Sequence, residues 1–454
     1  MQLRLIKEKE FYKKMLTIAV PIAIQNLITT SLNMIDTVMI GKLGETQIAA
    51  VGLANQLFFI FMIFLFSVNS GAGIFIAQFW GKKDIKNIRR VLGIALILGG
   101  VCSLFFFLCG FLIPEKVLKI FSQNDKKVII LGSQYLRIVS FSYLVNNISI
   151  AYGYGYRNIG QPKLPMIISG ISIILNTFLN YIFIFGKLGF SPMGIEGAAI
   201  ATLISRIFEC FLIVYVIYSK NHILAAKIKE MLDISREIFN KYFRTSIHII
   251  VDEGLWSLGI TFCSIAYARI GTEAFAAFQI SNTIQEIFMV VAIGIGNACA
   301  VMVGNNLGNK NFKKAEHYAK KFCIVGPILG LLIGSILFLI SNFIVNIFSV
   351  SHDVSIQAVR TLKVMSLFVW IRIYNTVMII GILRSGGDTK FTLFLETGTI
   401  WLVGVPLAFI GAFYFKLPIY LVVMLVSLEE VIKAILGTPR LISKKWVCNI
   451  VERI

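Results

Sequence analysis

The chain has 454 residues, of which 57% are hydrophobic and 15% are charged, and its mean hydropathy is +0.81. Soluble domains carry about a quarter charged residues, so this composition excludes a soluble globular protein and indicates a polytopic α-helical membrane protein. The net charge is +20, but the cations lie in short stretches between apolar runs, which favours membrane orientation over binding of nucleic acid.

Twelve apolar runs each reach the length of about 20 residues that a helix needs to cross a bilayer. They lie at 15–41, 48–79, 91–113, 131–156, 164–186, 194–218, 246–270, 275–305, 320–348, 358–383, 391–413 and 417–438. The first run follows the basic segment MQLRLIKEKEFYKKML and is as long as a full crossing, so it is predicted to be retained rather than cleaved as a signal peptide.

Lys and Arg are concentrated in every second connection between these runs. The basic connections are RLIKEKEFYKK, GKKDIKNIRR, RNIGQPK, the segment 219–245, GNKNFKKAEHYAKK, RSGGDTK and the tail from RLISKKW onward. Cytoplasmic loops carry such an excess, so both termini are expected in the cytoplasm of a cell-membrane protein. Arg157 and Arg384 are predicted to anchor helix ends there, and Glu429, Glu430 and Lys433 are predicted to lie at the membrane interface.

An internal repeat organises the chain. The stretch IAAVGLANQLFFIFM aligns without a gap with FAAFQISNTIQEIFM, and the same offset takes Lys83 to Lys310 and Arg157 to Arg384. The aligned loops keep the same side of the membrane, which predicts two six-helix halves, 1–218 and 246–454, joined by a cytoplasmic linker, 219–245. Parallel repeats of this kind enclose a central cavity in transporters, so the predicted function is transport.

The first apolar run contains a carboxylate, Asp36. A charge at the centre of a helix costs about 2.5–3.5 kcal/mol on insertion scales, so such a side chain normally faces protein or water. Gln25, Thr29, Asn33 and Asp36 recur at helical spacing and form one polar stripe. The stripe is either a helix-to-helix contact or a cation site.

Polar side chains on the fifth and sixth runs are the expected partners of Asp36. Asn176 and Asn180 lie one helical turn apart, and Thr202 lies on the next run. Carboxylate, amide and hydroxyl oxygens suit a hard cation, so Na⁺ is expected at Asp36 and Asn180. A protonated Asp36 held by the amides is the alternative.

The second half contains further acids within its apolar runs. Asp252 and Glu253 are adjacent on the seventh run, and the repeat places Asp252 opposite Gln25. Gln279, Asn282 and Glu286 form a stripe on the eighth run. These five residues, together with Gln25 and Asn33 of the first run, are secondary candidates for the cavity, with helix-to-helix hydrogen bonding as the alternative. Arg206 and Glu209 are expected to pair with each other or to reach the membrane interface. Arg372 and Glu396 are expected to form a cross-helix ion pair, with a second relay as the alternative.

Several motifs resemble one transporter family. MIDTVMIGKLGETQIAAVGLA, YGYRNIGQPKLP, LRSGGDTK and the terminal RLISKKW are similar to segments of the multidrug and toxic compound extrusion (MATE) exporters. The resemblance implies a multidrug antiporter that is coupled to Na⁺ or H⁺, exports amphipathic and mostly cationic drugs or xenobiotics by alternating access, and confers antibiotic resistance. It maps the family's amino-terminal cation site onto Asp36, Asn176, Asn180 and Thr202. Some members carry a second acid where this chain has Asn180, so Asp36 is the one carboxylate of that set here.

Two other classes of protein were weighed. A lipid-linked oligosaccharide flippase of the same superfamily needs several cations in its cavity, whereas the intramembrane charges here are acidic on balance apart from Arg206 and Arg372. A membrane enzyme is not favoured, because no DDxxD or HExxH pattern is present, and no GxxxxGK[ST] loop indicates direct use of ATP. The chain is therefore expected to act as a monomer with membrane lipid and small drugs as its partners, without a cofactor beyond the coupling ion.

Overall fold

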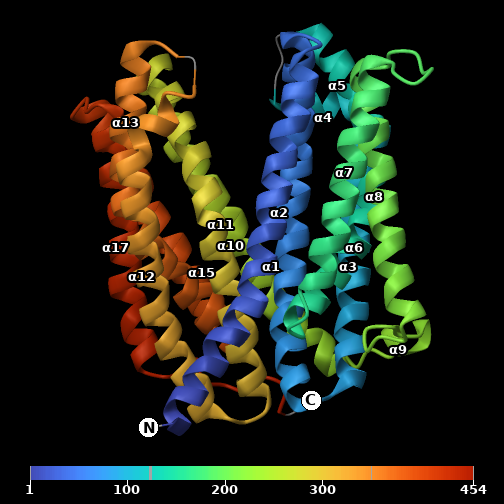
Figure 1. The fold of residues 1–454 in the computed structure, drawn as a ribbon, viewed down its shortest axis with the longest axis vertical. Helices are drawn as coiled ribbons and strands as arrows, with labels where there is room; N and C mark the ends of the chain where they lie inside the picture. The colour runs from blue at the N-terminus through green and yellow to red at the C-terminus, as the bar shows by residue number, and fades with distance from the viewer. Residues whose placement is uncertain (1, 122–124, 349, 453–454) are drawn as a thin grey trace. The chain divides into compact units, whose positions relative to one another are not determined.

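The computed structural model describes residues 2–121, 125–348 and 350–452, with the side chains of residues 2–7, 32 and 33 outside the described part. Within these residues every regular element is helical and no strand occurs, which confirms the predicted all-α class (Figure 1). The α-helices are α1 (Gln2–Gly41), α2 (Glu45–Lys82), α3 (Ile85–Leu112), α4 (Pro114–Phe121), α5 (Lys126–Val139), α6 (Phe141–Asn158), α7 (Lys163–Phe185), α8 (Gly194–Ser219), α9 (Ile228–Leu232), α10 (Arg236–Ile270), α11 (Thr272–Gly308), α12 (Phe312–Val345), α13 (His352–Leu367), α14 (Val369–Thr376), α15 (Thr389–Thr399), α16 (Val405–Phe409) and α17 (Ile419–Ile442).

Four short segments of tighter or wider helix complete the chain: η1 (Val377–Leu383), η2 (Arg384–Gly386), η3 (Ile400–Gly404) and η4 (Ile410–Tyr414). The stretch from α15 to η4 forms one continuous span, Thr389–Tyr414, that passes through two π-helical segments. Pro406 lies between these segments and cannot donate a backbone hydrogen bond, which accounts for the local change of helix type.

The described helices include nine that are long and apolar enough to cross a membrane, and two bent pairs that each make one further span. The pair α5 and α6 bends by 48°, and the chain from α13 through α14 to η2 bends by 47°. Helix α17 covers the twelfth predicted run, 417–438, but it contains Glu429, Glu430 and Lys433 in its middle and is not among these eleven apolar spans. All twelve predicted runs are helical, and the runs at 131–156 and 358–383 belong to bent spans rather than straight rods.

The internal repeat is confirmed in the backbone itself. Lys83 and Lys310 end helices α2 and α11 with left-handed φ angles of 61° and 56°. The residues that follow them, Asp84 and Asn311, cap the next helices by accepting a hydrogen bond from the backbone N–H three residues later, at 3.1 and 3.2 Å. Equivalent turns at equivalent positions show that both halves were built on one helical plan.

The chain forms two compact units. Unit 1 comprises Met1–Ala23 and Ile247–Ile454, and unit 2 comprises Ile24–Ser246, so helix α1 contributes to both. The halves expected from the repeat, 1–218 and 246–454 with the linker 219–245, remain a prediction.

Unit 2 packs α2, α3 and α5 to α8 around an aromatic core. Phe61 is fully buried and stacks on Tyr143 with the ring centroids 4.7 Å apart. Helix α9, in the segment after α8, is tied to α3 by ion pairs of Arg89 with Glu230, at 2.8 Å, and of Arg90 with Asp233. The backbone N–H of Lys227 lowers the pKa of Glu230, and the bond from Arg90 lowers the pKa of Asp233.

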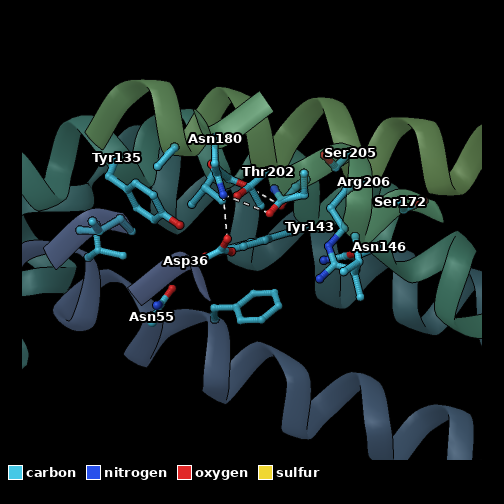
Figure 2. A pocket seen from close by; sticks show the side chains of 18 of the residues that line it. Asp36, Asn55, Tyr135, Tyr143, Asn146, Ser172, Asn180, Thr202, Ser205 and Arg206 are labelled. Atoms are coloured by element: carbon cyan, nitrogen blue, oxygen red, sulfur yellow. Dashed lines mark hydrogen bonds between the residues drawn. The ribbon is translucent and has the colours of Figure 1, made fainter. Parts of the chain in front are cut away.

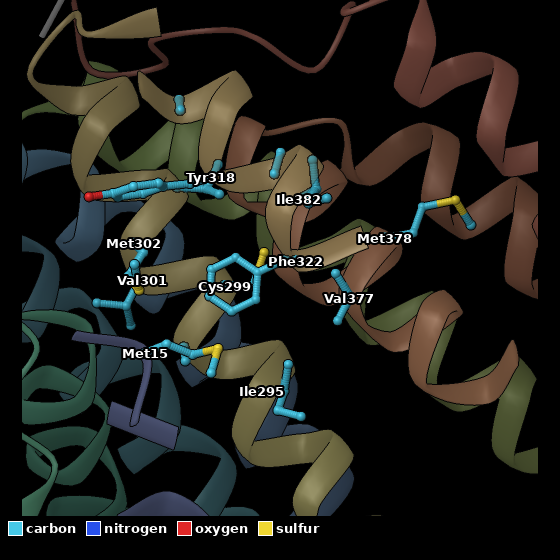
Figure 3. Close-up of a cluster of buried hydrophobic side chains, with 14 of the residues drawn as sticks. Met15, Ile295, Cys299, Val301, Met302, Tyr318, Phe322, Val377, Met378 and Ile382 are labelled. Atoms are coloured by element: carbon cyan, nitrogen blue, oxygen red, sulfur yellow. The ribbon is translucent and has the colours of Figure 1, made fainter. Parts of the chain in front are cut away.

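Unit 1 has an apolar core that is rich in sulfur-containing side chains (Figure 3). Met15 from α1 and Met302 from α11 pack with Phe322 of α12 and with Met378 of η1. Unbranched, polarisable methionine side chains fill irregular gaps between helices, which suits a helix such as η1 that departs from regular α geometry.

Candidate functional site

Unit 2 contains a cavity of about 400 Å³ whose wall includes Asp36 (Figure 2). The lining comes from α1, α2, α5, α6, α7 and α8, all within this unit. The lining residues are Asp36, Thr37, Ile40, Val51, Asn55, Phe58, Phe59, Met62, Tyr135, Val139, Ser142, Tyr143, Asn146, Ser172, Ile173, Asn176, Asn180, Ala198, Thr202, Ser205, Arg206 and Glu209.

The structure brings the four predicted cation-site residues together at this cavity. Asn180 Nδ2 donates to Asp36 Oδ1 at 2.7 Å and to Asn176 Oδ1 at 3.1 Å. Both asparagines project from one face of α7 and are buried, as their spacing predicts, and Thr202 joins them from α8. Their role in binding a cation remains a prediction.

Among the described residues the Asp36 carboxylate has a neutral hydrogen-bond partner and forms no ion pair. In the part of the chain that the structure describes, no Lys, Arg or His nitrogen lies within 4.0 Å of it. The buried Oδ1 atom of Asn180 likewise has no hydrogen-bond partner among the described residues. A buried carbonyl oxygen without a donor is costly, and a cation supplies the missing partner. The oxygen atoms of Asp36, Asn176, Asn180 and Thr202 therefore fit a small hard cation such as Na⁺.

The wall beside Asp36 is apolar and aromatic. Phe58, Phe59 and Met62 line it from α2, and Tyr143 lines it from α6. Aromatic faces attract organic cations, and methionine adapts its shape to different ligands, so this wall suits amphipathic cations of varied structure.

Arg206 and Glu209 line the same cavity and form the predicted ion pair, at 2.9 Å. Glu209 also accepts from Ser169 Oγ at 2.7 Å, and Ser169 accepts from Gln25 Nε2 at 2.9 Å. Arg157 Nη2 donates to Gln25 Oε1 at 2.8 Å. Gln25 thus belongs to a hydrogen-bonded chain behind the cavity rather than to its lining, and the side chain of Asn33 lies outside the described residues.

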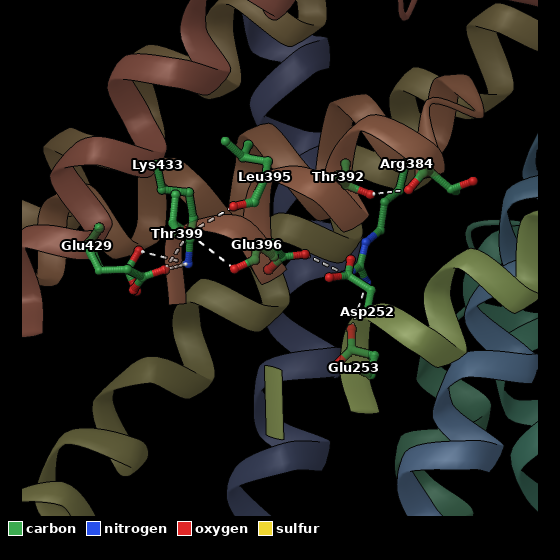
Figure 4. Close-up of polar contacts among 11 residues, drawn as sticks. Asp252, Glu253, Arg384, Thr392, Leu395, Glu396, Thr399, Glu429 and Lys433 are labelled. Carbon is green, nitrogen blue, oxygen red and sulfur yellow. Dashed lines mark hydrogen bonds and ion pairs between the residues drawn. The ribbon is translucent and has the colours of Figure 1, made fainter. Parts of the chain in front are cut away.

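Unit 1 holds the acids of the seventh span in a different arrangement (Figure 4). Arg384 Nη2 lies 2.9 Å from Asp252 Oδ2 and 2.7 Å from Glu396 Oε2, and its Nη1 lies 2.8 Å from Glu253 Oε1. The prediction that Arg384 anchors a helix end in a cytoplasmic loop is wrong, because its side chain is only 3% exposed. Three carboxylates from two helices compensate the charge and make this burial possible.

A second buried charge group lies beside the first in unit 1. Lys433 Nζ lies 2.7 Å from Glu429 and 3.7 Å from Glu430, and Thr399 Oγ1 donates to Glu429 at 2.7 Å. The prediction that these α17 residues are interfacial is wrong, because Glu429 and Lys433 are buried and neutralise each other.

The prediction that Arg372 pairs with Glu396 is also wrong. Arg372 donates to Gln285 at 2.9 Å and lies 3.8 Å from Glu430, while Glu396 is taken by Arg384. Helical periodicity locates a residue on its own helix but does not indicate which of several opposite charges it meets.

The candidates on α11 stand apart from both charge groups. Gln279 and Glu286 are exposed, and Asn282 Nδ2 donates to Glu286 Oε1 at 2.8 Å, one helical turn away. The structure therefore does not bring this stripe together with Asp252 and Glu253.

Sequence reasoning missed Arg384, Glu396 and Lys433 as members of a buried network. The repeat offset offered a signal, because it aligns Arg384 with Arg157 and Asp252 with Gln25. Arg157 donates to Gln25 in unit 2, and Arg384 donates to Asp252 in unit 1. Two adjacent acids within an apolar span also favour a cation nearby.

The chain is similar to known proteins over nearly its whole length. The MatE family profile matches residues 21–182 and 249–410. The chain is 27% identical to a probable multidrug resistance protein NorM of Thermotoga maritima, over 90% of this chain and 87% of that protein. It is 23% identical to a probable multidrug resistance protein YoeA of Bacillus subtilis, over 90% and 88%.

Solved structures share the fold. A MOP superfamily transporter from Pyrococcus furiosus superposes with a TM-score of 0.87 at 19% identity, covering 95% of each chain. A multidrug resistance MATE family transporter in an outward-facing conformation also gives 0.87, at 20% identity, covering 95% of this chain and 96% of the other. The two matched segments together span most of the chain and fall on its two repeated halves, and the chain therefore belongs to the MatE family, the multidrug and toxic compound extrusion family.

Proposed function

We propose that the protein is a multidrug efflux antiporter that exchanges Na⁺ or H⁺ for amphipathic, mostly cationic drugs. The observation that carries the proposal is the state of Asp36: a carboxylate that lines a cavity of about 400 Å³, bonded to Asn180 and without a cation within 4.0 Å among the described residues. An uncompensated acid in a membrane span is otherwise costly, so a mobile positive charge is its natural partner.

Different residues of the cavity are proposed to bind the ion and the drug. Asp36, Asn180 and Thr202 offer carboxylate, amide and hydroxyl oxygens to Na⁺, or the Asp36 carboxylate takes a proton while Asn180 keeps its orientation. A cationic drug is drawn by the same carboxylate and packs on the aromatic wall. Export follows when the ion and the drug prefer different conformations, because each ligand then shifts the equilibrium against the other.

Two further observations support an exporter. The relatives from Thermotoga maritima and Bacillus subtilis are named probable multidrug resistance proteins. A flippase would need several free cations to hold a pyrophosphate, whereas Arg206, which lines the unit 2 cavity, is paired with Glu209, and Arg384 and Lys433 of unit 1 face carboxylates. In this proposal the protein works as a monomer in the cell membrane, with both termini cytoplasmic as the distribution of Lys and Arg favours.

The test is ethidium transport by the purified protein in liposomes, driven separately by a Na⁺ gradient and by a pH gradient. The wild type is expected to respond to one of the two ions, and Asp36→Asn is expected to abolish gradient-driven transport. Glu196→Gln, which removes an exposed carboxylate at the start of α8, is the control and is expected to retain transport. Undiminished transport by the Asp36→Asn protein would refute the assignment.

A further inference from the structure

We propose that the segment between α8 and α10 is a membrane anchor whose outer face binds anionic phospholipid headgroups. The segment comprises residues 220–235, which include α9, and it continues into the first turns of α10; all of it belongs to unit 2. Figure 1 shows α9 beside the end of α8. The inference goes beyond the proposed function, because the segment lies outside the cavity that contains Asp36.

The acids of α9 and of the turn after it are bound to α3. Glu230 pairs with Arg89 at 2.8 Å, and Asp233 pairs with Arg90. The two arginines lie in the second turn of α3, immediately before the apolar run at 91–113. The contact therefore holds α9 where this span leaves the bilayer, at the depth of the lipid headgroups.

The apolar side chains of the segment fall into two groups. Leu224 and Ala226 are 0% and 1% exposed, so the protein itself buries them. Ile228 and Leu232 lie one helical turn apart on α9 and are 75% and 61% exposed. The second group forms an apolar face that no part of the described chain covers.

The first turns of α10 extend this apolar face. Phe239 and Phe243 are 36% and 46% exposed, and their rings stack with the centroids 6.0 Å apart. They immediately precede the apolar run at 246–270, which crosses the membrane. The exposed apolar side chains thus lead directly into a helix that enters the bilayer.

The charges that remain on the outer face are positive. Lys229 and Arg236 are exposed and form no ion pair among the described residues, since the nearby Glu237 is bound to Lys241 at 3.0 Å. Interfacial helices combine an apolar face that enters the acyl boundary with cations that meet anionic headgroups. The position at the ends of two spans favours lipid over an acidic protein as the occupant.

Photo-cross-linking at position 232 tests what covers the segment. The full-length protein with benzoylphenylalanine in place of Leu232 is irradiated in phosphatidylcholine vesicles that contain a minor fraction of phosphatidylglycerol, and the adducts are identified by mass. We expect lipid adducts in which phosphatidylglycerol exceeds its share of the vesicle. Two cations near the surface correspond to an enrichment of up to about thirtyfold.

Two matched double variants show whether the cations cause the enrichment. Lys229→Gln with Arg236→Gln should lower the phosphatidylglycerol share of the adducts to its share of the vesicle, while lipid adducts persist through the apolar contact. Lys126→Gln with Lys127→Gln removes the same charge from two exposed lysines at the start of α5 and should keep the enrichment. An absence of lipid adducts, or an equal phosphatidylglycerol share in both double variants, overturns the proposal.

The same cross-linking in membranes of the expressing cells distinguishes lipid from a protein partner. Adducts of phospholipid mass are expected there as well. Adducts to another protein in place of phospholipid would assign the apolar face to a protein interface and overturn the anchor.

Discussion

The two units place different chemistry at equivalent positions of one duplicated scaffold. In unit 2 a single arginine donates to a neutral glutamine, which in turn bonds to a serine. In unit 1 an arginine is surrounded by carboxylates. The repeat offset pairs Gln25 with Asp252, Ser169 with Glu396 and Arg157 with Arg384.

A second set of equivalent positions shows the same divergence. The offset takes Thr202 to Glu429 and Arg206 to Lys433. In unit 1 these two residues neutralise each other at 2.7 Å. In unit 2 Thr202 is neutral, Arg206 pairs with Glu209 at 2.9 Å, and among the described residues Asp36 has no cation within 4.0 Å. The comparison teaches that a duplicated helical plan fixes where polar groups lie, while single substitutions decide whether the site is closed by internal ion pairs or left open to a ligand.

The largest difference in stability loss between the two units is expected when Arg384 or Arg157 is replaced. Arg384→Gln leaves three buried or partly buried carboxylates without their cation, and breaking a buried pair costs about 3–5 kcal/mol. Arg157→Gln removes a hydrogen bond to a neutral amide and is expected to cost about 1–2 kcal/mol. Thermal unfolding of the purified proteins in detergent measures both. Equal losses would show that the carboxylates of unit 1 do not depend on Arg384.

Converting unit 1 to the residues of unit 2 should be milder than removing its arginine. The double variant Asp252→Gln with Glu396→Ser keeps the pair of Arg384 with Glu253 at 2.8 Å and lowers the number of buried acids. We expect a loss of about 2 kcal/mol, because hydrogen bonds to a charged group are lost while no carboxylate is stranded. A loss as large as that of Arg384→Gln, in the same unfolding assay, would contradict this explanation.

The site of unit 2 can be made to resemble unit 1 by replacing Asn180 with leucine, because the aligned residue of unit 1 is Leu407. Asn180→Leu removes the hydrogen bond from Asn180 Nδ2 to Asp36 and an oxygen atom available to a cation. The ion concentration for half-maximal transport is expected to rise about tenfold, the effect of one lost interaction of about 1.4 kcal/mol. Thr177→Val is the control, because the Thr177 hydroxyl donates to the backbone of its own helix at Ile173. An unchanged ion requirement in the Asn180→Leu protein would exclude Asn180 from the cation site.

The smallest difference concerns two hydroxyls at aligned positions, Thr399 and Ser172. Thr399→Val removes the bond to Glu429 at 2.7 Å and should lower stability by about 1 kcal/mol. The Ser172 hydroxyl is buried without a partner among the described residues, so Ser172→Ala should stay within about 0.5 kcal/mol of wild type. Thermal unfolding in detergent measures the midpoint of each variant. A larger effect of Ser172→Ala would show that the Ser172 hydroxyl has a bound partner.

The fold was largely predictable because membrane spans can be recognised by the length of their apolar runs and because the repeat aligns without a gap in its most similar stretch. The grouping of Asn176 and Asn180 with Asp36 was also predictable, since their spacing places both on one face of α7, while their role in binding a cation remains a prediction. The bend at Ser140 between α5 and α6 was not, because neither side of the break differs from an ordinary apolar run. Local pattern carries no information about such a change of direction.

The buried network of unit 1 escaped prediction for a different reason. Arg384 is the first residue of RSGGDTK, a sequence typical of a cytoplasmic turn. Its burial becomes evident only when Asp252, 132 residues earlier in the chain, is found beside it. Contacts of that range follow from helix packing, which periodicity within a single helix does not reveal.

That separation of 132 residues has a consequence for how the protein is made. Asp252 and Glu253 leave the ribosome well before the arginine that will neutralise them. At about 5–20 residues per second, the two acids wait on the order of ten seconds for Arg384 to be synthesised. During that interval α10 carries uncompensated charge at a cost of a few kcal/mol in the bilayer. We therefore expect α10 to stay at the translocon, or to be solvated by water and lipid headgroups, until the tenth span is inserted.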